Sequence, residues 1–106
     1  MFCRKKYCRC LQNYDISIEE LKNKVEQGAI LLDVRSRQEY REGHLEGAIN
    51  IPEFEIKNRI EKEIPNKTQM IVIYCQYGGR SKKICILMKK LGYVNIYNLY
   101  GGLNIL

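Results

Sequence analysis

The sequence predicts one α/β domain built on a roughly five-stranded parallel sheet. Short apolar runs rich in β-branched residues alternate with segments whose apolar residues recur every three to four positions. Strands and helices that alternate at this spacing form right-handed βαβ units, in which the strands are parallel. The chain has 106 residues, the length of a single domain.

Most predicted elements carry a start or stop signal. Ser17, with Glu20 three residues later, matches a capping box, and Ser36 is expected to cap the next helix. Pro52 prevents the third strand from being central, because proline cannot donate a ladder hydrogen bond. The expected strands are residues 15–16, 29–34, 48–50, 70–74 and 95–99, and the expected helices are residues 18–27, 37–42, 54–64 and 81–91.

The most informative stretch runs from residue 70 to residue 91. It opens with Met70-Ile71-Val72-Ile73-Tyr74, an apolar run typical of a strand buried on both faces. Cys75 stands where this run stops, and two glycines and Arg80-Ser81 follow it. We therefore expect Cys75 in a tight strand-to-helix loop at the carboxyl end of a parallel strand, where ligands bind in open α/β sheets.

This position favours a thiolate at Cys75. Backbone N–H groups of a curled, glycine-containing loop converge on an anion, and the positive end of the following helix adds to that field. The pKa of a cysteine in such a setting falls from about 8.5 to roughly 3.5–7.5, and Arg80 adds a permanent positive charge. The alternative is a buried structural cysteine, but the Gly-Gly-Arg-Ser sequence behind it favours the reactive one.

Three motifs resemble the signatures of the rhodanese (sulfurtransferase) family, in family order over roughly residues 14 to 102. Cys75, four further residues and Arg80-Ser81 resemble the active-site loop. The segment from Gly92-Tyr93 to Leu99-Tyr100-Gly101-Gly102 is similar to the C-terminal signature. The remaining signature is matched by Leu32-Asp33-Val34-Arg35, Glu39-Tyr40, Gly43-His44-Leu45 and Gly47-Ala48-Ile49-Asn50-Ile51-Pro52.

The resemblance implies a three-layer α/β/α rhodanese-like fold over residues 13–106. It also implies a thiosulfate sulfurtransferase in which Cys75 carries a sulfane sulfur as a persulfide, from a small anionic donor to a thiol or protein acceptor. Neither a metal nor an organic cofactor is expected. The expected substrate-binding residues are Gln76, Tyr77, Gly78, Gly79, Arg80 and Ser81, and the expected supporting residues are Asp33 and Arg35.

Other reactive side chains are better explained structurally. Asp33 and Arg35 are expected on the same rim as Cys75, more as an ion-pair network with Glu39 or Arg37 that pins their loop than as substrate ligands. His44, the only histidine, would suit a Cys–His pair, but it lies in a part of the signature that is structural in the family. Cys85 would suit a resolving thiol, but its apolar neighbours predict a buried, inert one. Tyr77 is expected either at the mouth of the pocket or simply exposed.

Composition excludes several other classes of protein. No apolar run approaches the length of a membrane span, and the N-terminus lacks the apolar region of a secretory signal, so a cytoplasmic protein is expected. Four cations within residues 1–12 account for most of the net charge of +6, which leaves the charge of the remaining residues too balanced for a nucleic-acid surface.

Residues 1–12 are expected to be a flexible basic tail. The spacing of Cys3, Cys8 and Cys10 does not match that of zinc ligands.

Two other functions compete with an enzyme that transfers sulfur. One is a non-catalytic persulfide carrier or interaction module, which the sequence does not distinguish from the enzyme. The other is a phosphatase or arsenate reductase, because a Cys-loop-Arg-Ser motif also holds tetrahedral oxyanions. Their loop has five residues between cysteine and arginine, whereas Gln76, Tyr77, Gly78 and Gly79 make four here.

The sequence departs from the rhodanese pattern near its C-terminus. Family members commonly continue past the two glycines with a helix that carries an aromatic residue, often tryptophan. This sequence contains no tryptophan and has Leu103-Asn104-Ile105-Leu106 after the glycines. We therefore expect the shape of one pocket wall to differ from the family pattern.

Overall fold

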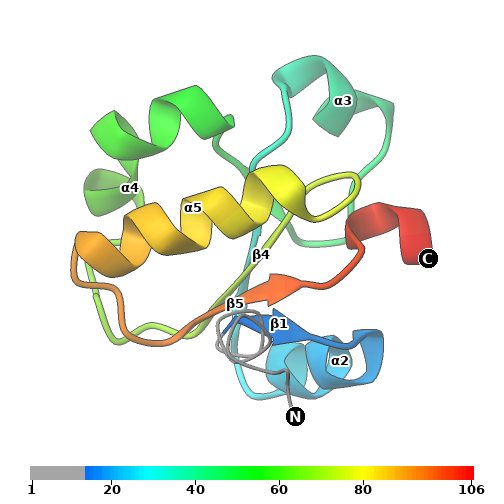
Figure 1. Cartoon of the computed structure of the whole chain (residues 1–106), viewed down its shortest axis with the longest axis horizontal. Coiled ribbons are helices and arrows are strands. Elements are labelled where there is room, and N and C mark those ends of the chain that lie inside the picture. Colours follow the sequence, from blue (N-terminus) through cyan, green and yellow to red (C-terminus); the bar gives the residue numbers. More distant parts are fainter. Residues whose placement is uncertain (1–13) are drawn as a thin grey trace, which may run out of the picture.

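Five parallel strands form a single sheet in the order β1-β5-β4-β2-β3 (Figure 1). The computed structural model describes residues 14–106, so the predicted tail and its cysteines Cys3, Cys8 and Cys10 lie outside the described residues. The strands are β1 (Asp15–Ile16), β2 (Ile30–Asp33), β3 (Ile49–Asn50), β4 (Ile71–Tyr74) and β5 (Ile96–Leu99). The helices are α2 (Ile18–Glu26), α3 (Arg37–Glu42), η1 (Glu53–Glu55), α4 (Ile56–Glu63), α5 (Gly79–Lys90) and η2 (Gly102–Ile105).

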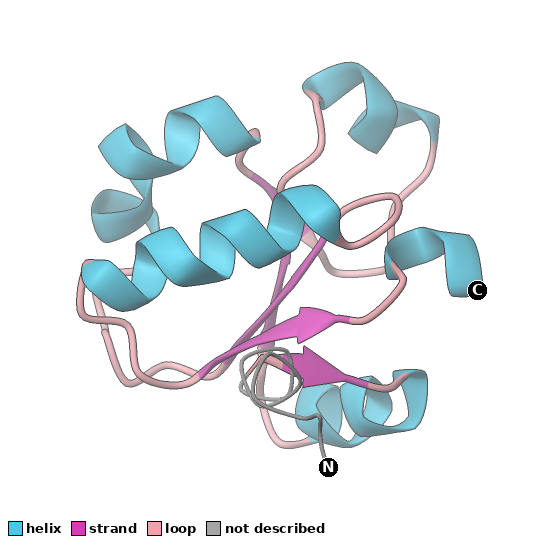
Figure 2. Cartoon of the chain, in the orientation of Figure 1, coloured by secondary structure: helices cyan, strands magenta, loops and turns pink. Residues whose placement is uncertain are grey.

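The helices cover both faces of the sheet, as the predicted three-layer fold requires. Helices α4 and α5 lie on one face and α2 on the other (Figures 1 and 2). The two outer strands, β1 and β3, are also the shortest, with two residues each. The prediction that Pro52 follows an edge strand is therefore confirmed.

Strand β4 shows why the two faces have separate cores. Ile71, Ile73 and Cys75 pack in the core on the side of α4 and α5, whereas Val72 and Tyr74 pack in the core on the side of α2. Successive side chains of a strand point to opposite faces, and all of these are buried. The apolar run needs no polar alternation because both faces of this central strand are covered.

Both predicted helix caps are present. The Ser17 hydroxyl accepts from the Glu20 amide at 3.2 Å while the Glu20 carboxylate accepts from the Ser17 amide at 2.8 Å. Ser36 and Glu39 make the same reciprocal pair at the start of α3. Each pair satisfies two backbone N–H groups that a helix end leaves open.

Two helices differ from the predicted boundaries. The segment expected as one helix over residues 54–64 is the 3-10 turn η1 followed by α4. Helix α5 begins at Gly79, two residues before the prediction, because Gly78 has a φ of 99° and reverses the chain at once. The Lys82 amide already donates to the Gly78 carbonyl at 3.1 Å. The loop between Cys75 and the helix is therefore shorter than the sequence suggested.

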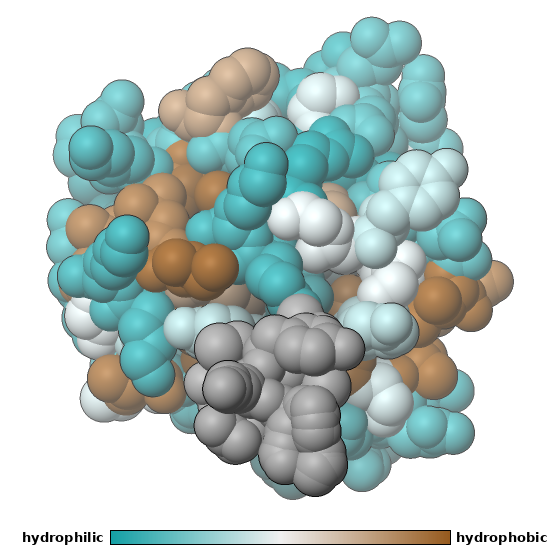
Figure 3. All heavy atoms as spheres, in the orientation of Figure 1, coloured by the Kyte–Doolittle hydropathy of each residue, from teal (hydrophilic) through white to brown (hydrophobic). Residues whose placement is uncertain are grey.

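The surface over α5 is mostly hydrophilic, with scattered apolar side chains (Figure 3). Within residues 14–106, every helix is too short or too polar to cross a membrane.

Candidate active site

Cys75 follows directly after β4 and is buried, with 1% of its surface exposed. Its side chain extends the alternation of the strand and packs in the core under α5. The first turn of α5 closes around it, because Gly78 turns the chain back immediately after the loop. The short link between β4 and α5 thus positions the thiol at the N-terminus of a twelve-residue helix, whose dipole is positive at that end.

Two backbone amides and one hydroxyl surround the sulfur of Cys75. The amide of Gly78 donates to Sγ at 3.1 Å, and the amide of Ser81 donates at 3.4 Å. The hydroxyl of Ser81 lies 3.3 Å from Sγ. This ring of N–H and O–H groups is the anion-binding arrangement that the glycine-containing loop predicted.

These donors change the acidity of the thiol. Burial by itself would raise the pKa of Cys75, but hydrogen bonds from the Ser81 hydroxyl and from the amides of Ser81, Gly78 and Tyr77 outweigh it and lower the pKa. The cause is that each donor stabilises the thiolate and not the thiol. A nucleophilic sulfur is therefore favoured without a neighbouring base.

A buried polar network that the sequence analysis missed lies behind the loop. Asn98 of β5 is 1% exposed, and its Oδ1 accepts from the Ser81 hydroxyl at 2.5 Å. Its Nδ2 donates to Asp15 Oδ1 at 2.9 Å, and Asp15 Oδ2 accepts from Lys82 at 2.7 Å. Asn98 therefore positions the hydroxyl that contacts Cys75. One feature of the sequence could have identified Asn98: it is a polar residue inside the predicted strand 95–99. The structure places it opposite Ile73 of β4.

The C-terminal turn η2 holds the loop from its other side. The amide of Leu103 donates to the Cys75 carbonyl at 3.0 Å, and that of Asn104 donates to the Gln76 carbonyl at 2.9 Å. Gly102 has a φ of 62°, and a Cβ there would lie 2.4 Å from the Cys75 carbonyl oxygen. Only glycine permits this approach. The turn η2 thus forms a wall of the site.

Asp33 and Arg35 lie on the predicted rim, as a buried pair. Arg35 is 4% exposed, and its Nε and Nη2 both donate to the Asp33 carboxylate, Nη2 at 2.8 Å. Nη2 also donates to the Gly43 carbonyl at 2.6 Å, and Nη1 donates to Gln76 Oε1 at 3.4 Å. The pair thus joins β2, the end of α3 and the loop. The expected network forms, but with Gln76 and Gly43 as partners instead of Glu39 or Arg37.

Arg80 is engaged by an acidic side chain from α3. Its two terminal nitrogens donate to the two carboxylate oxygens of Glu39 at 2.9 and 3.0 Å. The hydrogen bond from Arg80 is the main reason that the pKa of Glu39 falls to about 2. Glu39 also completes the cap on Ser36, so one carboxylate links the start of α3 to the start of α5.

The remaining candidates lie where the structural interpretations placed them. The His44 ring is exposed, stacks on Tyr40 and contacts the Tyr40 carbonyl at 2.7 Å. Cys85 is fully buried in the core, and burial raises its pKa to about 12. Tyr77 is 70% exposed, and it lines a hollow of about 310 Å³ together with Tyr100 and the loop glycines.

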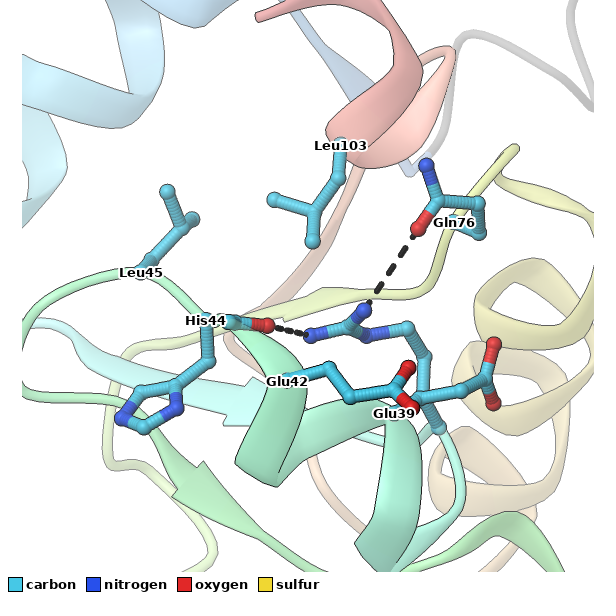
Figure 4. A pocket seen from close by; sticks show the side chains of 8 residues that line it. Glu39, Glu42, His44, Leu45, Gln76 and Leu103 are labelled. Atoms are coloured by element: carbon cyan, nitrogen blue, oxygen red, sulfur yellow. Dashed lines mark hydrogen bonds between the residues drawn. The ribbon is translucent and has the colours of Figure 1, made fainter.

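A larger cavity of about 490 Å³ borders the loop on the side of α3 (Figure 4). Gln76 of the loop lines this cavity. Glu39, the partner of Arg80, and Glu42 line one side of it. Leu45 and Leu103 form the opposite wall. The cavity thus combines charged and apolar side chains on one side of the loop that follows Cys75.

Comparisons with known proteins agree with this architecture. The model of the rhodanese-like domain matches residues 17–104. The thiosulfate sulfurtransferase PspE of Escherichia coli (strain K12) is 38% identical over 72 residues, which is 68% of each chain. The putative sulfur carrier protein YrkF of Bacillus subtilis (strain 168) is 35% identical over 91 residues, and the match spans 84% of this chain but 48% of YrkF.

A solved structure shows the same fold. The human single-domain sulfurtransferase TSTD1 superposes with a TM-score of 0.75 at 31% identity, over 83% of this chain and 89% of TSTD1. The family match spans nearly all described residues and includes the loop around Cys75. This chain belongs to the rhodanese-like domain family of sulfurtransferases.

Proposed function

We propose that the protein is a thiosulfate sulfurtransferase that works through a persulfide on Cys75. The Cys75 thiolate attacks the outer sulfur of thiosulfate, a new S–S bond forms, and the S–S bond of thiosulfate breaks to release sulfite. The thiolate supplies the electron pair for the new bond, and sulfite leaves with the pair of the old one. This is covalent catalysis by an activated nucleophile.

In the second half-reaction an acceptor takes the sulfur. A thiolate, an acceptor protein or cyanide attacks the outer sulfur of the persulfide, and the Cys75 thiolate leaves. The same donors that stabilise the thiolate also stabilise this leaving group. The cycle needs neither a metal nor an organic cofactor, because thiolate and persulfide exchange one sulfur atom without net redox change.

The observation that carries this proposal is the convergence of the Gly78 amide, the Ser81 amide and the Ser81 hydroxyl on Sγ. In our proposal residues Gln76 to Ser81 bind the sulfur donor, and Asp33 and Arg35 support the loop. Arg80 favours anionic donors through its charge, which Glu39 moderates. The thiol chemistry also suits a reducing, cytoplasmic setting.

The central experiment combines intact mass with turnover. Thiosulfate is expected to add the mass of one sulfur atom to the wild type, and cyanide is expected to remove it. Cys75→Ser is expected to add none and to have no turnover. A wild type that gains no sulfur, or a Cys75→Ser variant that turns over, contradicts the proposal.

The relative YrkF supports a persulfide carrier as the second candidate. A carrier loads in a single turnover but discharges only to its partner, so free turnover with thiosulfate and cyanide would be negligible. Rapid-mix measurement of loading beside steady-state turnover separates the two functions. Fast loading with no turnover favours the carrier.

The phosphatase alternative is weaker. With four residues between Cys75 and Arg80 the ring has one amide fewer than the phosphatase loop, and a phosphoryl group needs donors for three equatorial oxygens. We expect sulfur transfer but no measurable hydrolysis of p-nitrophenyl phosphate. Phosphatase turnover that disappears in Cys75→Ser would reverse this assignment.

A further inference from the structure

We propose that Asn98 is a positioning residue that competes with the sulfur of Cys75 for the single proton of the Ser81 hydroxyl. While Cys75 is a neutral thiol, Ser81 donates this proton to Asn98. When the sulfur carries a negative charge, the hydroxyl turns and donates to Sγ, and Asn98 loses its hydrogen bond. Asn98 thereby limits how strongly Ser81 stabilises the thiolate. The consequence for sulfur transfer rests on the proposed function, whereas the competition itself does not.

The Ser81 hydroxyl lies among more acceptors than it can serve. Its Oγ is 2.5 Å from Asn98 Oδ1, 3.2 Å from the Gly78 carbonyl oxygen and 3.3 Å from Cys75 Sγ. A hydroxyl has one proton to donate and two lone pairs that accept. Ser81 is 0% exposed, so bulk water does not compete for this proton. Only one of the three groups receives it at a time, and the Asn98 oxygen is the nearest.

The orientation of the Asn98 amide is set by its other neighbour, Asp15. The oxygen and the nitrogen of a side-chain amide can exchange places, and their hydrogen-bond partners decide between the two arrangements. A carboxylate only accepts, so the group that lies 2.9 Å from Asp15 Oδ1 is the amide nitrogen of Asn98. The other oxygen of Asp15 accepts from Lys82 Nζ at 2.7 Å in an ion pair. The Asn98 oxygen therefore faces Ser81, and it can only accept.

These contacts give the hydrogen bonds a single direction while Cys75 is neutral. Because Asn98 takes the proton of Ser81, the Cys75 S–H is the donor in the contact between Sγ and Oγ. The Asn98 N–H in turn donates to Asp15. Cys75, Ser81 and Asn98 are each at most 1% exposed, so every donor in this chain depends on the next acceptor.

Ionisation of Cys75 reverses one link of the chain. The thiol proton leaves to solvent, and Sγ changes from a donor to a charged acceptor. A hydrogen bond to a charged acceptor is about twice as strong as one between neutral groups, so the Ser81 hydroxyl turns to Sγ. Its O–H bond stays intact, and only the acceptor changes. The Asn98 oxygen is then buried without that hydrogen bond, which costs free energy and partly offsets the stabilisation of the thiolate.

In the proposed reaction the hydroxyl changes its acceptor in each half-reaction. When Sγ attacks the donor, its charge is replaced by a covalent S–S bond, and Ser81 donates to Asn98 again. When the persulfide is discharged, Cys75 leaves as the thiolate, and Ser81 turns back to Sγ. Asn98 thus raises the free energy of the thiolate relative to the persulfide. It favours loading of sulfur and opposes its discharge.

The charged groups around Cys75 form ion pairs that do not involve the Ser81 hydroxyl. Arg80 of α5 interacts with the charge of Cys75, and Glu53 of η1 acts on Arg80. The ion pairs on the elements around the loop are Arg80–Glu39, Lys82–Asp15 and Arg35–Asp33. All of these residues are kept in the variants below. A change in the pH profile between variants therefore reports the hydroxyl and its acceptors.

The test is a double-mutant cycle on the pH dependence of Cys75 alkylation. The full chain is compared as wild type, Asn98→Val, Ser81→Ala and the double variant, with modification by iodoacetamide measured on the Cys75 peptide. Valine suits a buried strand position and has no side-chain acceptor. In Asn98→Val the acid ionisation constant of Cys75 should increase about two- to tenfold, the size of one neutral hydrogen bond. The midpoint of alkylation should move to lower pH accordingly.

The Ser81→Ala background is the matched control. Without the hydroxyl there is no proton to compete for, so adding Asn98→Val should leave the midpoint where Ser81→Ala has it. If Asn98 only held the hydroxyl against Sγ, Asn98→Val would raise the midpoint as Ser81→Ala does. That result would overturn the proposed role. An equal effect of Asn98→Val with and without the hydroxyl would overturn it too.

A measurement on the wild-type chain covers the case in which Asn98→Val does not fold. The side-chain amide resonances of Asn98 are followed by NMR while Cys75 is titrated. They should shift with the midpoint of Cys75, because the Asn98 oxygen loses its hydrogen bond at that point. In Ser81→Ala the shift should be several times smaller, since only the field of the thiolate remains. Resonances that ignore Cys75, or that respond equally in both proteins, contradict the competition.

These outcomes are separate from those of the proposed function, because alkylation and NMR need no sulfur transfer. A cycle that behaves as expected in a protein that forms no persulfide supports the role of Asn98 and rejects the transferase. Where a persulfide forms, Asn98→Val should load more slowly per thiolate and discharge faster to cyanide. The reason is that a thiol of lower pKa is a weaker nucleophile and a better leaving group. Faster loading per thiolate would contradict the proposed role while leaving the transferase intact.

Discussion

Cys75 and Cys85 are both buried in the same core, Cys75 in the loop before α5 and Cys85 on α5 itself, and yet their acidities are shifted in opposite directions. Cys75 is 1% exposed and Cys85 is 0% exposed. The pKa of Cys75 is lowered, whereas that of Cys85 is raised to about 12. Burial alone therefore does not determine the acidity of the two thiols.

The difference comes from the donors around each sulfur. Cys75 lies at the start of α5, where amide N–H groups have no intrahelical partner and two of them reach Sγ. Cys85 lies in the middle of α5, where the amides are used by the helix itself, so burial dominates its pKa. We therefore expect a thiol to be reactive in this fold where backbone N–H groups have no other partner. Comparing the two cysteines tests this expectation.

The largest expected effect is on where the sulfur is stored. Peptide mapping after thiosulfate treatment should find the added sulfur on Cys75 alone. Cys85→Ala should load as the wild type does, and Cys75→Ser should not load. Sulfur found on Cys85 in the wild type would mean that the donors around Cys75 do not determine the site.

The next largest effect is on the rates at which the two thiols are alkylated. At pH 7 we expect iodoacetamide to modify Cys75 at least about a thousandfold faster than Cys85, because a thiol with a pKa near 12 has almost no thiolate at that pH. The readout is the ratio of the two modified peptides against time. In denaturant the two thiols should react alike, which serves as the control. Comparable alkylation rates of Cys75 and Cys85 in the folded protein would contradict the opposite pKa shifts of the two thiols.

A smaller effect is the pH dependence of stability, which should have opposite signs for the two thiols. The raised pKa of Cys85 means that its unfolded thiol ionises first, so stability should fall above about pH 8.5, by up to about 1.4 kcal/mol per pH unit. The lowered pKa of Cys75 makes stability rise with pH up to about 8.5. The free energy of unfolding is measured with urea between pH 6 and 10. Its fall above pH 8.5 should disappear in Cys85→Ala, and its rise up to pH 8.5 should disappear in Cys75→Ser. Unchanged slopes in both variants would contradict the two pKa shifts.

The smallest expected effect comes from removing one donor. Ser81→Ala should raise the pKa of Cys75, because the hydroxyl is the largest of the hydrogen bonds that lower it. The pH at half-maximal alkylation should move upward, and loading at pH 6 should slow by up to about tenfold, or 1.4 kcal/mol, since the amides of Ser81, Gly78 and Tyr77 remain. Ser17→Ala is the control, because Ser17 caps α2 and makes no contact with Cys75. An unchanged pH profile in Ser81→Ala would mean that the amides suffice.

Local patterns predicted most of the fold and the position of Cys75 between β4 and α5. The apolar run before Cys75 and the helical spacing after it identified β4 and α5 within two residues. The capping boxes at Ser17 and Ser36 identified two helix starts. These features depend on residues within one or two turns of each other, so a single sequence contains them.

Partners that are distant in the sequence were not predictable in the same way. Asn98 reaches Ser81 only because β5 pairs with β4 in a register that places Asn98 opposite Ile73. Glu39 meets Arg80 across 41 positions of the chain, whereas the sequence analysis expected Glu39 or Arg37 in the network of Asp33 and Arg35. Such contacts depend on how elements pack, which periodicity and propensity do not specify.

The hydrogen bonds from η2 to the loop have a consequence for folding during translation. The chain emerges from the ribosome N-terminus first, so β4 and Cys75 appear well before residues 102–104 do. Until then the carbonyls of Cys75 and Gln76 lack the amides of Leu103 and Asn104, and Ser81 lacks Asn98. A nascent chain therefore carries Cys75 in a loop without these hydrogen bonds, and the groups around its sulfur are fixed only once β5 and η2 have docked.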